Sequence, residues 1–145
     1  MKALVTGACG FVGRYLLAEL CSTGWETVAA DVLDEPPAGG PTAGEADGEV
    51  LPPPALPAGA RYRRCDCTDP VAAAALVDEA APDAVFHLAA QSSAGRSFDD
   101  PFGTFRTNVF GTLGLLEALR ASPRGADTVF LLSLIHISEP TRLRR

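Results

Sequence analysis

A glycine-rich segment between a short apolar run and a helix-like run constrains the fold of this chain most strongly. The segment reads TGACGFVG, from Thr6 to Gly13, and it follows the strand-like residues 2–6. Its glycines, Gly7, Gly10 and Gly13, suit a tight turn, a close approach of the backbone to a pyrophosphate, and tight packing of the next helix. The free N–H groups and the dipole at that helix's N-terminus favour an anion. The segment therefore predicts a strand–turn–helix unit that binds the pyrophosphate of a dinucleotide.

An acidic residue at the expected distance supports this interpretation. Asp31 lies 18 residues after Gly13, at the end of a second predicted strand over residues 27–32. A carboxylate there accepts hydrogen bonds from the adenosine ribose of a dinucleotide, whereas a 2′-phosphate would require a nearby arginine. No arginine occurs in residues 32–60, so the sequence favours NAD over NADP. The open alternative is that Arg61, Arg63 or Arg64 folds back toward Asp31.

Strands and helices alternate along the rest of the chain up to about residue 131. Further strands are predicted at 61–65, at 84–88 and from 128, and helices at 11–23, 71–80 and 101–121. Each of the last two helices follows an Asp-Pro pair, which supplies an N-cap and a first-turn proline. Residues 34–60 are dense in proline and glycine and predict a long surface loop. The alternation predicts a Rossmann-type, doubly wound parallel sheet that is truncated in its fifth strand.

Composition and charge exclude several classes of partner. The chain has 145 residues, a net charge of −6 and a pI near 4.8. Nucleic acid or an anionic membrane surface would require a basic face, so neither is expected as a partner. No apolar run approaches the roughly 20 residues of a membrane span, and the N-terminus does not read as a signal peptide. Four cysteines without metal-ligand spacing predict reduced thiols, no metal site and a cytoplasmic protein.

Five pieces of the sequence together resemble the extended short-chain dehydrogenase/reductases, the NAD-dependent epimerase/dehydratase branch that acts on nucleotide sugars. They are TGACGFVG, Asp31, CDCTDP, FHLAAQSS and TNVFGTLGLLEAL. The resemblance implies NAD as cofactor, with Asp66 facing the adenine and Asn108 supporting the site from a long helix. The cofactor-binding residues that it implies are Gly7, Gly10, Phe11, Val12, Gly13, Asp31, Asp66, Cys67, Leu88, Ala89, Ala90, Gln91 and Asn108. Ser92 and Ser93 are the implied substrate-binding residues.

Within this family, residues 87–118 are most similar to enzymes that act on GDP-linked 6-deoxyhexoses, because QSS is followed by RSF and DP. The similarity implies a reductase like GDP-4-dehydro-6-deoxymannose reductase, with hydride moving between the nicotinamide and C4 of the sugar. A nucleotide-sugar 4,6-dehydratase or 4-epimerase is the alternative, because sugar and base are recognised mainly in the C-terminal half. The resemblance also implies that the full-length parent is a homodimer.

Four further residues call for separate interpretation. His87 ends a buried strand, where a packed and hydrogen-bonded histidine is more common than a catalytic one, and no triad-like partner accompanies it. Arg96 either meets a phosphate or is a solvated loop residue, and the sequence does not choose between them. Glycine within a helix lowers the stability of that helix, so Gly111 and Gly114 predict that the long helix packs closely against a neighbouring segment at these positions.

The residues that carry out the family's chemistry are missing from this chain. The family uses Tyr-x-x-x-Lys, in which the lysine ammonium lowers the tyrosine pKa, and a Ser or Thr beyond the fifth strand. The chain has two tyrosines, Tyr15 and Tyr62, and its lysine is Lys2, so no such pair is present. We therefore expect the parent to be an enzyme and the 145-residue chain to be inactive. A non-catalytic dinucleotide-binding module is the alternative.

The final segment departs from the composition of the rest. Leu132 to Arg142 reads LSLIHISEPTR and resembles the in-frame translation of a sequencing-library adapter, and no isoleucine precedes residue 135. We therefore interpret residues 1–131 as the NAD-binding domain of a longer parent and residues 132–145 as an artefactual tail. The Ser, His and Glu in that tail are accordingly not assembled into a catalytic site.

Overall fold

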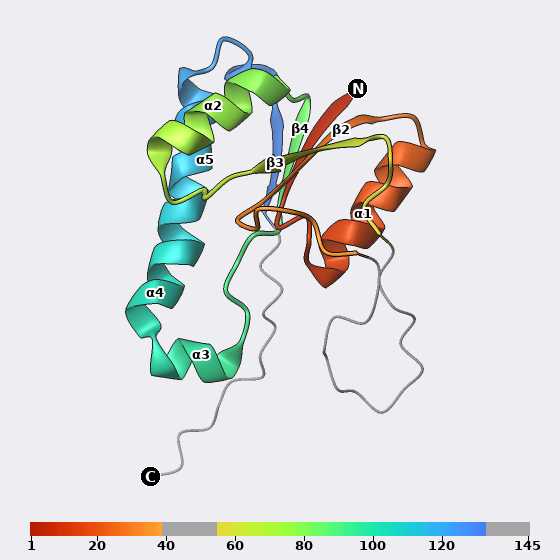
Figure 1. The fold of residues 1–145 in the computed structure, drawn as a ribbon. Coiled ribbons are helices and arrows are strands. Elements are labelled where there is room, and N and C mark those ends of the chain that lie inside the picture. Colours follow the sequence, from red (N-terminus) through yellow and green to blue (C-terminus); the bar gives the residue numbers. More distant parts are fainter. Residues whose placement is uncertain (39–54, 133–145) are drawn as a thin grey trace.

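The computed structural model describes residues 1–38 and 55–132, and within them five parallel strands form one sheet (Figure 1). The strands are β1 (Lys2–Thr6), β2 (Glu26–Asp31), β3 (Ala60–Arg64), β4 (Ala84–His87) and β5 (Val129–Leu132). They lie in the order β3-β2-β1-β4-β5, with β1 at the centre. After β3 the chain crosses to the other side of β1, so a topological switch point lies between β1 and β4.

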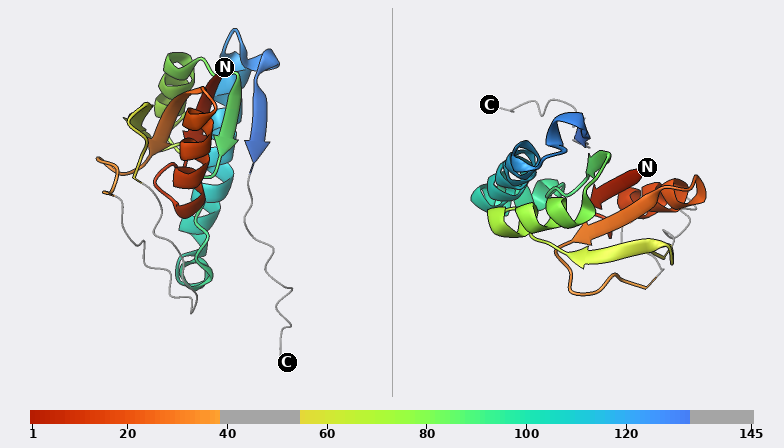
Figure 2. Two further views of the ribbon diagram at one scale, coloured as in Figure 1. Left: turned by 90° about the vertical axis from the view of Figure 1, so that its right-hand side faces the viewer. Right: turned by 90° about the horizontal axis from the view of Figure 1, so that it is seen from above.

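Helices cover both faces of this sheet (Figures 1 and 2). α1 lies on one face, whereas α2 and α5 lie on the other face and pack against each other. α3, α4 and the π-helix η1 lead from the carboxyl edge of the sheet into α5. The helical elements are α1 (Phe11–Ser22), α2 (Pro70–Ala80), α3 (Ala94–Asp99), α4 (Pro101–Phe105), η1 (Arg106–Phe110), α5 (Gly111–Ala121) and the 3₁₀ turn η2 (Gly125–Asp127). The predicted doubly wound parallel sheet is confirmed.

The central strands are apolar because helices bury both of their faces. Alternate residues of β1 point to opposite sides, so Leu4 joins the cluster under α2 and α5 and Val5 joins the cluster under α1. Leu76 and Leu115 contribute to the first cluster and Leu17 to the second. Each large apolar side chain buried in this way stabilises the fold by roughly 1.5–3 kcal/mol. The two clusters hold the strand ends, and therefore the loops that follow them, in fixed positions.

The two edges of the sheet differ in chemistry. At the β3 edge the side chains are charged and paired, with Arg61 bound to Glu26 at 3.2 Å and Arg63 bound to Glu79 at 2.5 Å. At the β5 edge the side chains are apolar and open to solvent, and Val129 is 58% exposed. Paired charges discourage a further strand from adding to an edge, whereas exposed apolar residues do not.

The helices agree with the sequence-based expectation except near the carboxyl edge. α2 begins as predicted, with Pro70 at its first position and the Asp69 carboxylate accepting the Val71 N–H at 2.9 Å. The long helix predicted over residues 101–121 is present, but its hydrogen bonding changes to the π type at η1. α3 was not predicted. No helix among the described residues is long and apolar enough to cross a membrane.

Two of the expectations reach into parts of the chain that the structure does not describe. The predicted proline-rich loop at 34–60 is neither helix nor strand at residues 34–38 and 55–59, and its remaining residues lie outside the described ranges. The interpreted tail covers residues 132–145; Leu132 is the last residue of β5, and residues 133–145 lie outside the described ranges.

Candidate functional site

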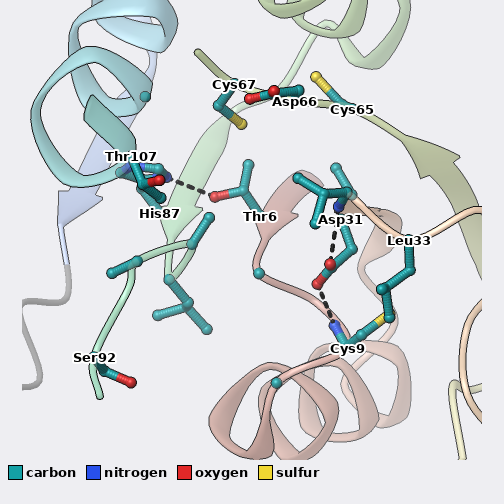
Figure 3. A pocket seen from close by; sticks show the side chains of 18 of the residues that line it. Thr6, Cys9, Asp31, Leu33, Cys65, Asp66, Cys67, His87, Ser92 and Thr107 are labelled. Atoms are coloured by element: carbon teal, nitrogen blue, oxygen red, sulfur yellow. Dashed lines mark hydrogen bonds between the residues drawn. The ribbon is translucent and has the colours of Figure 1, made fainter. Parts of the chain in front are cut away.

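A cavity of about 500 Å³ opens at the carboxyl edge of the sheet, at the switch point between β1 and β4 (Figure 3). Its walls come from the glycine-rich loop and from the segments that directly follow β2, β3 and β4. Open α/β sheets bind ligands at this place, where strands end and the connections diverge. The residues predicted from the sequence that line the cavity are Gly7, Gly10, Phe11, Val12, Asp31, Asp66, Cys67, Leu88, Ala89, Ala90 and Ser92.

The glycine-rich loop requires its glycines for close backbone packing. Gly7 has a φ of +68°, and a Cβ on it would stand 2.6 Å from the backbone nitrogen of Ala89. A Cβ on Gly13 would overlap the carbonyl oxygen of Gly7, so the first turn of α1 rests directly on the loop. Gly13 therefore acts through packing, as predicted, and does not line the cavity. Gly10 has more room, with the Gly7 oxygen as its nearest neighbour at 3.1 Å.

The N-terminus of α1 is open to an anionic ligand. No side-chain hydrogen bond caps it at Gly10, and its first turn carries no acidic residue. Phe11 and Val12 line the cavity at this point, where backbone N–H groups and the helix dipole favour negative charge. The backbone here thus fits a pyrophosphate group.

Asp31 is held at the end of β2 by two backbone donors. Its Oδ2 accepts the Cys9 N–H at 3.0 Å and its Oδ1 accepts the Val32 N–H at 2.8 Å, which leaves acceptor capacity on both oxygens for ribose hydroxyls. Arg64 does fold back toward this end of β2, where its Nε donates to the Val32 carbonyl at 3.2 Å. However, Arg64 pairs with Asp34 at 2.9 Å. Arg64 thus has an acidic partner in this exposed pair, and it is not among the residues that line the cavity.

Asp66 and Cys67 follow β3 and form the wall opposite the glycine-rich loop (Figure 3). The Thr68 N–H and hydroxyl donate to Asp66 Oδ1 at 2.9 and 2.8 Å, and these bonds lower the pKa of Asp66, so the carboxylate is ionised at neutral pH. The neighbouring Cys65 and burial raise the pKa of Cys67, so it remains a thiol. All four cysteines are free thiols. No group of three metal-ligating side chains occurs within residues 1–38 and 55–132.

The segment after β4 separates this cavity from a second, smaller one. Ser92 faces the first cavity, whereas Gln91 lines the second, of about 310 Å³, together with Arg96. Ser93 lines neither of these cavities, because its hydroxyl accepts the Arg96 N–H at 3.4 Å and caps α3. Of the two implied substrate-binding serines, the structure thus places Ser92 on the main cavity and Ser93 behind it. Arg96 is exposed and faces a cavity, which keeps its phosphate-binding interpretation open.

Asn108 lies in η1, and its side chain binds the segment after β4, which forms part of the cavity wall. Its Oδ1 accepts the Gln91 N–H at 2.7 Å, and its Nδ2 donates to the Gln91 carbonyl at 3.2 Å. Asn108 is not among the residues that line either cavity described above. The close packing expected of Gly114 is confirmed, because a Cβ there would overlap the Cys67 carbonyl oxygen, whereas Gly111 has room at 3.7 Å from Cys67.

His87 is a packed and hydrogen-bonded residue, as the sequence indicated. It is 1% exposed, with Nδ1 2.6 Å from the Thr6 hydroxyl and Nε2 3.1 Å from the Thr112 hydroxyl. Burial lowers the pKa of His87 to about 4, so the imidazole is neutral at pH 7. His87 is one of the residues that line the main cavity, and its neutral imidazole adds no charge there.

We expect acid to destabilise the fold through His87. The unfolded chain protonates this residue near its ordinary pKa of 6.5, whereas the folded chain resists protonation down to about 4. Stability is therefore complete above pH 6.5 and falls by up to about 1.4 kcal/mol per pH unit between these values. Urea unfolding at pH 7 and pH 5 measures this loss, and a His87→Gln variant isolates it from the carboxylates. Equal pH dependence in both proteins would contradict the assignment.

Several residues of the cavity wall were not predicted. Thr6 precedes Gly7, and Val32 and Leu33 are the two residues after Asp31, so their position at a strand end was an available signal. Thr107 enters from η1, and it is the first residue of the TNVFGTLGLLEAL segment, in which the sequence analysis singled out Asn108 but not Thr107.

Comparison with known proteins agrees with the geometry of this site. Residues 3–138 match the model of the NAD dependent epimerase/dehydratase family. The GDP-6-deoxy-D-mannose reductase of Pseudomonas aeruginosa is 34% identical over 132 residues, 90% of this chain and 32% of the relative. The dTDP-glucose 4,6-dehydratase of Shigella flexneri is 34% identical over 121 residues, 83% of this chain and 31% of the relative.

A solved structure agrees with these sequence relatives. The crystal structure of Thermus thermophilus UDP-glucose 4-epimerase in complex with NAD superposes with a TM-score of 0.66 at 32% identity. That match covers 83% of this chain and 34% of the epimerase. The chain thus spans about a third of the length of the proteins it matches.

Proposed function

Because this chain belongs to the NAD-dependent epimerase/dehydratase family, we propose that it forms the NAD-binding part of a nucleotide-sugar oxidoreductase. The observation that carries the proposal is the cavity of about 500 Å³ at the switch point, which joins an uncapped helix N-terminus to the Asp31 carboxylate. A pyrophosphate requires the first of these features and an adenosine ribose the second. Both occur in one cavity here.

Different residues around the cavity would contact different parts of the dinucleotide. Gly10, Phe11 and Val12 would hold the pyrophosphate, and Asp31 the adenosine ribose. Asp66 and Cys67 would flank the adenine, while residues 88–92 would approach the nicotinamide half across the switch point. When bound, NAD supplies a hydride acceptor or donor. The chain's own contribution is to orient the dinucleotide and to exclude water from one side of it.

For the parent protein we propose a reductase similar to GDP-4-dehydro-6-deoxymannose reductases. The Gln-Ser-Ser sequence at 91–93, with RSF and DP in the next helices, supports this choice, as does the 34% identity to the Pseudomonas reductase. A 4,6-dehydratase or a 4-epimerase on a nucleotide sugar is the alternative, favoured by the similar identity to the Shigella dehydratase. Ser92, which faces the main cavity, is the proposed substrate contact within this chain.

The acid/base chemistry would come from residues beyond this chain. Its sequence contains no Tyr-x-x-x-Lys, so we propose that the 145 residues alone bind NAD but do not turn over a nucleotide sugar. The same observation favours a second candidate function, a non-catalytic dinucleotide-binding module. Sequencing the source gene across codon 131 separates the two, because an enzyme requires Tyr-x-x-x-Lys downstream and a module does not.

Two further properties of the parent are proposed. A homodimer is supported by an apolar surface on α3, α4 and η1, where Phe98 is 81% and Phe102 is 87% exposed, followed by Phe105 and Phe110. An apolar surface of this kind usually marks a protein contact. A cytoplasmic location is supported by the four free thiols.

The direct test is a calorimetric titration of the 145-residue chain with NAD and with NADP. We expect saturable binding of NAD and an affinity for NADP that is lower by about tenfold or more, because a 2′-phosphate would approach Asp31. A Gly10→Leu variant is the matched control, since its side chain would occupy the pyrophosphate position. Equal heats for the wild type and Gly10→Leu would contradict the proposed function.

A further inference from the structure

We propose that Cys65 and Cys67 form a two-thiol site that captures trivalent arsenic, and that the occupied site prevents a dinucleotide from entering the main cavity. The capture itself depends only on the two thiols and on their access to the cavity. The exclusion of a dinucleotide rests on the function proposed above, because it assumes that the adenine lies against this wall.

The two cysteines stand on either side of Asp66 in the segment that follows β3 (Figure 3). Both line the main cavity, although only 5% of Cys65 and 7% of Cys67 is exposed. Both also belong to the apolar cluster under α2 and α5, whereas the Asp66 carboxylate between them binds Thr68. The two thiols therefore share one side of the segment, and a small reagent reaches them through the cavity.

The two thiols interact with each other. The Cys67 thiol donates a hydrogen bond to Cys65, and this bond lowers the pKa of Cys65. The same bond, together with burial, raises the pKa of Cys67. Because the thiolate is the form that attacks an electrophile, Cys65 is the first nucleophile of the pair. Cys67 lies beside it as the second ligand.

The backbone on both sides of the pair is fixed. Cys65 donates its N–H to the Asp31 carbonyl at 2.7 Å, which continues the pairing of β2 with β3. At the other end, α5 packs so closely on the Cys67 carbonyl oxygen that a Cβ on Gly114 would overlap it. Two thiols held in this way lose little further freedom when they bind a single atom together, which favours chelation.

Two thiols suit trivalent arsenic better than they suit a metal ion. A structural zinc site has four ligands, and no group of three metal-ligating side chains occurs within the ranges 1–38 and 55–132. An organic arsenic(III) oxide needs only two thiols. Two sulfur–arsenic bonds replace the arsenic–oxygen double bond, and the oxygen leaves as water with both thiol protons. Arsenic remains trivalent and no sulfur is oxidised, so the step requires no oxidant or reductant.

The test treats the 145-residue chain with phenylarsine oxide, in a buffer free of other thiols, and locates the adduct by mass spectrometry. Trypsin separates the cysteines, because Cys9 falls in residues 3–14, Cys21 in residues 15–61, and Cys65 and Cys67 together in residues 65–96. We expect one phenylarsenic group per chain, on the 65–96 peptide, while iodoacetamide alkylates the other two cysteines after unfolding. Arsenic on another peptide, or none on any, would overturn the proposal without the use of a variant.

Serine variants test whether both thiols are needed. Cys65→Ser and Cys67→Ser should each weaken capture by about 100-fold or more, because the second sulfur–arsenic bond forms within one molecule. Cys21→Ser is the matched control, since the Cys21 thiol lies 3.2 Å from the Thr27 hydroxyl and lines neither cavity. Capture should be unchanged in Cys21→Ser and in Cys9→Ser, although Cys9 lines the main cavity. Unweakened capture by Cys67→Ser, or lost capture in Cys9→Ser, would contradict the assignment.

Protection by ligands tests the exclusion of a dinucleotide. NAD or ADP at ten times its dissociation constant should slow capture by about tenfold, because only the unoccupied chain presents the thiols. Capture that neither ligand slows, in a chain that binds NAD, would refute the exclusion. Capture by a chain that binds neither NAD nor ADP would support the two-thiol site and refute the proposed function. Binding of NAD without capture would refute the site and leave the proposed function intact.

Discussion

Replacing Gly7 by alanine is expected to abolish dinucleotide binding and to destabilise the fold by about 3 kcal/mol or more. A Cβ at this position would stand 2.6–2.8 Å from three backbone atoms of Leu88 and Ala89, and backbone cannot move aside as a flexible side chain can. The φ of +68° adds about 1 kcal/mol of strain for a residue with a side chain. Relief of the overlap must push the glycine-rich loop away from β4. Urea unfolding and a calorimetric titration with NAD measure the two effects.

Gly24→Ala separates backbone strain from overlap. Gly24 has a φ of +82°, close to that of Gly7, but a Cβ there would meet nothing within 4 Å. We expect this variant to lose about 1 kcal/mol of stability and to bind NAD with unchanged affinity. If Gly7→Ala cost no more than Gly24→Ala, the close packing between the loop and the segment after β4 would not be a determinant of the fold.

Replacing Asp31 by alanine is expected to lower the affinity for NAD by about 10- to 100-fold, the value of hydrogen bonds to a charged acceptor. The carboxylate also binds the N–H groups of Cys9 and Val32, so its loss loosens the contact between the glycine-rich loop and β2. Binding of NADP should fall much less, because the charge that repels a 2′-phosphate is removed along with the ribose acceptor. Parallel titrations with NAD and NADP give the ratio of affinities.

Asp34→Ala is the control for this effect. Asp34 is three residues further on, its side chain is 91% exposed, and it pairs with Arg64. Its removal takes away the same charge but leaves the hydrogen bonds of Asp31 in place. We expect NAD affinity to remain within about twofold of the wild type and binding of NADP to improve, because Arg64 is released beside the ribose position. A loss of NAD affinity as large as that of Asp31→Ala would show that net charge, not the ribose contact, governs binding.

The sequence predicted those parts of the molecule that depend on local patterns. β1, β2 and β4 were recognisable because strands buried on both faces are continuously apolar. The start of α2 was recognisable because Asp69 and Pro70 satisfy the requirements of a helix N-terminus by themselves. The tight turn at Gly7 and the packing role of Gly13 followed from the spacing of the motif, since a Cβ on Gly13 would meet backbone atoms of Gly7 and Ala8 only a few residues away. The close approach of Gly7 to the backbone of Leu88 and Ala89 was not predicted.

The features that escaped prediction depend on contacts between distant residues. α3 has six residues and a Ser93 cap, too short for a helical period to appear in the sequence. No residue type in the sequence signals the π-turn at η1. Its contacts are long-range: Thr112 hydrogen-bonds to His87 of β4, and Asn108 hydrogen-bonds to Gln91 beyond β4. Asn108 was expected to support the cofactor site from the long helix; its side chain binds the main chain of Gln91, and its role toward the cofactor stays a prediction. Ser93 was expected at the substrate, and its placement at a helix cap leaves that role a prediction.

The unequal edges of the sheet limit how copies of this domain can aggregate. At β3 the side chains are the exposed charged residues of the Arg61–Glu26 and Arg63–Glu79 pairs, and charged side chains disfavour the addition of a strand at this edge. At β5 an incoming strand meets exposed valine and leucine side chains. A fibre requires two adhesive edges on every copy, so that each one joins to the next. Among residues 1–38 and 55–132 only the β5 edge is of this kind, so we expect edge-to-edge association of the 145-residue chain to end at a pair joined through β5.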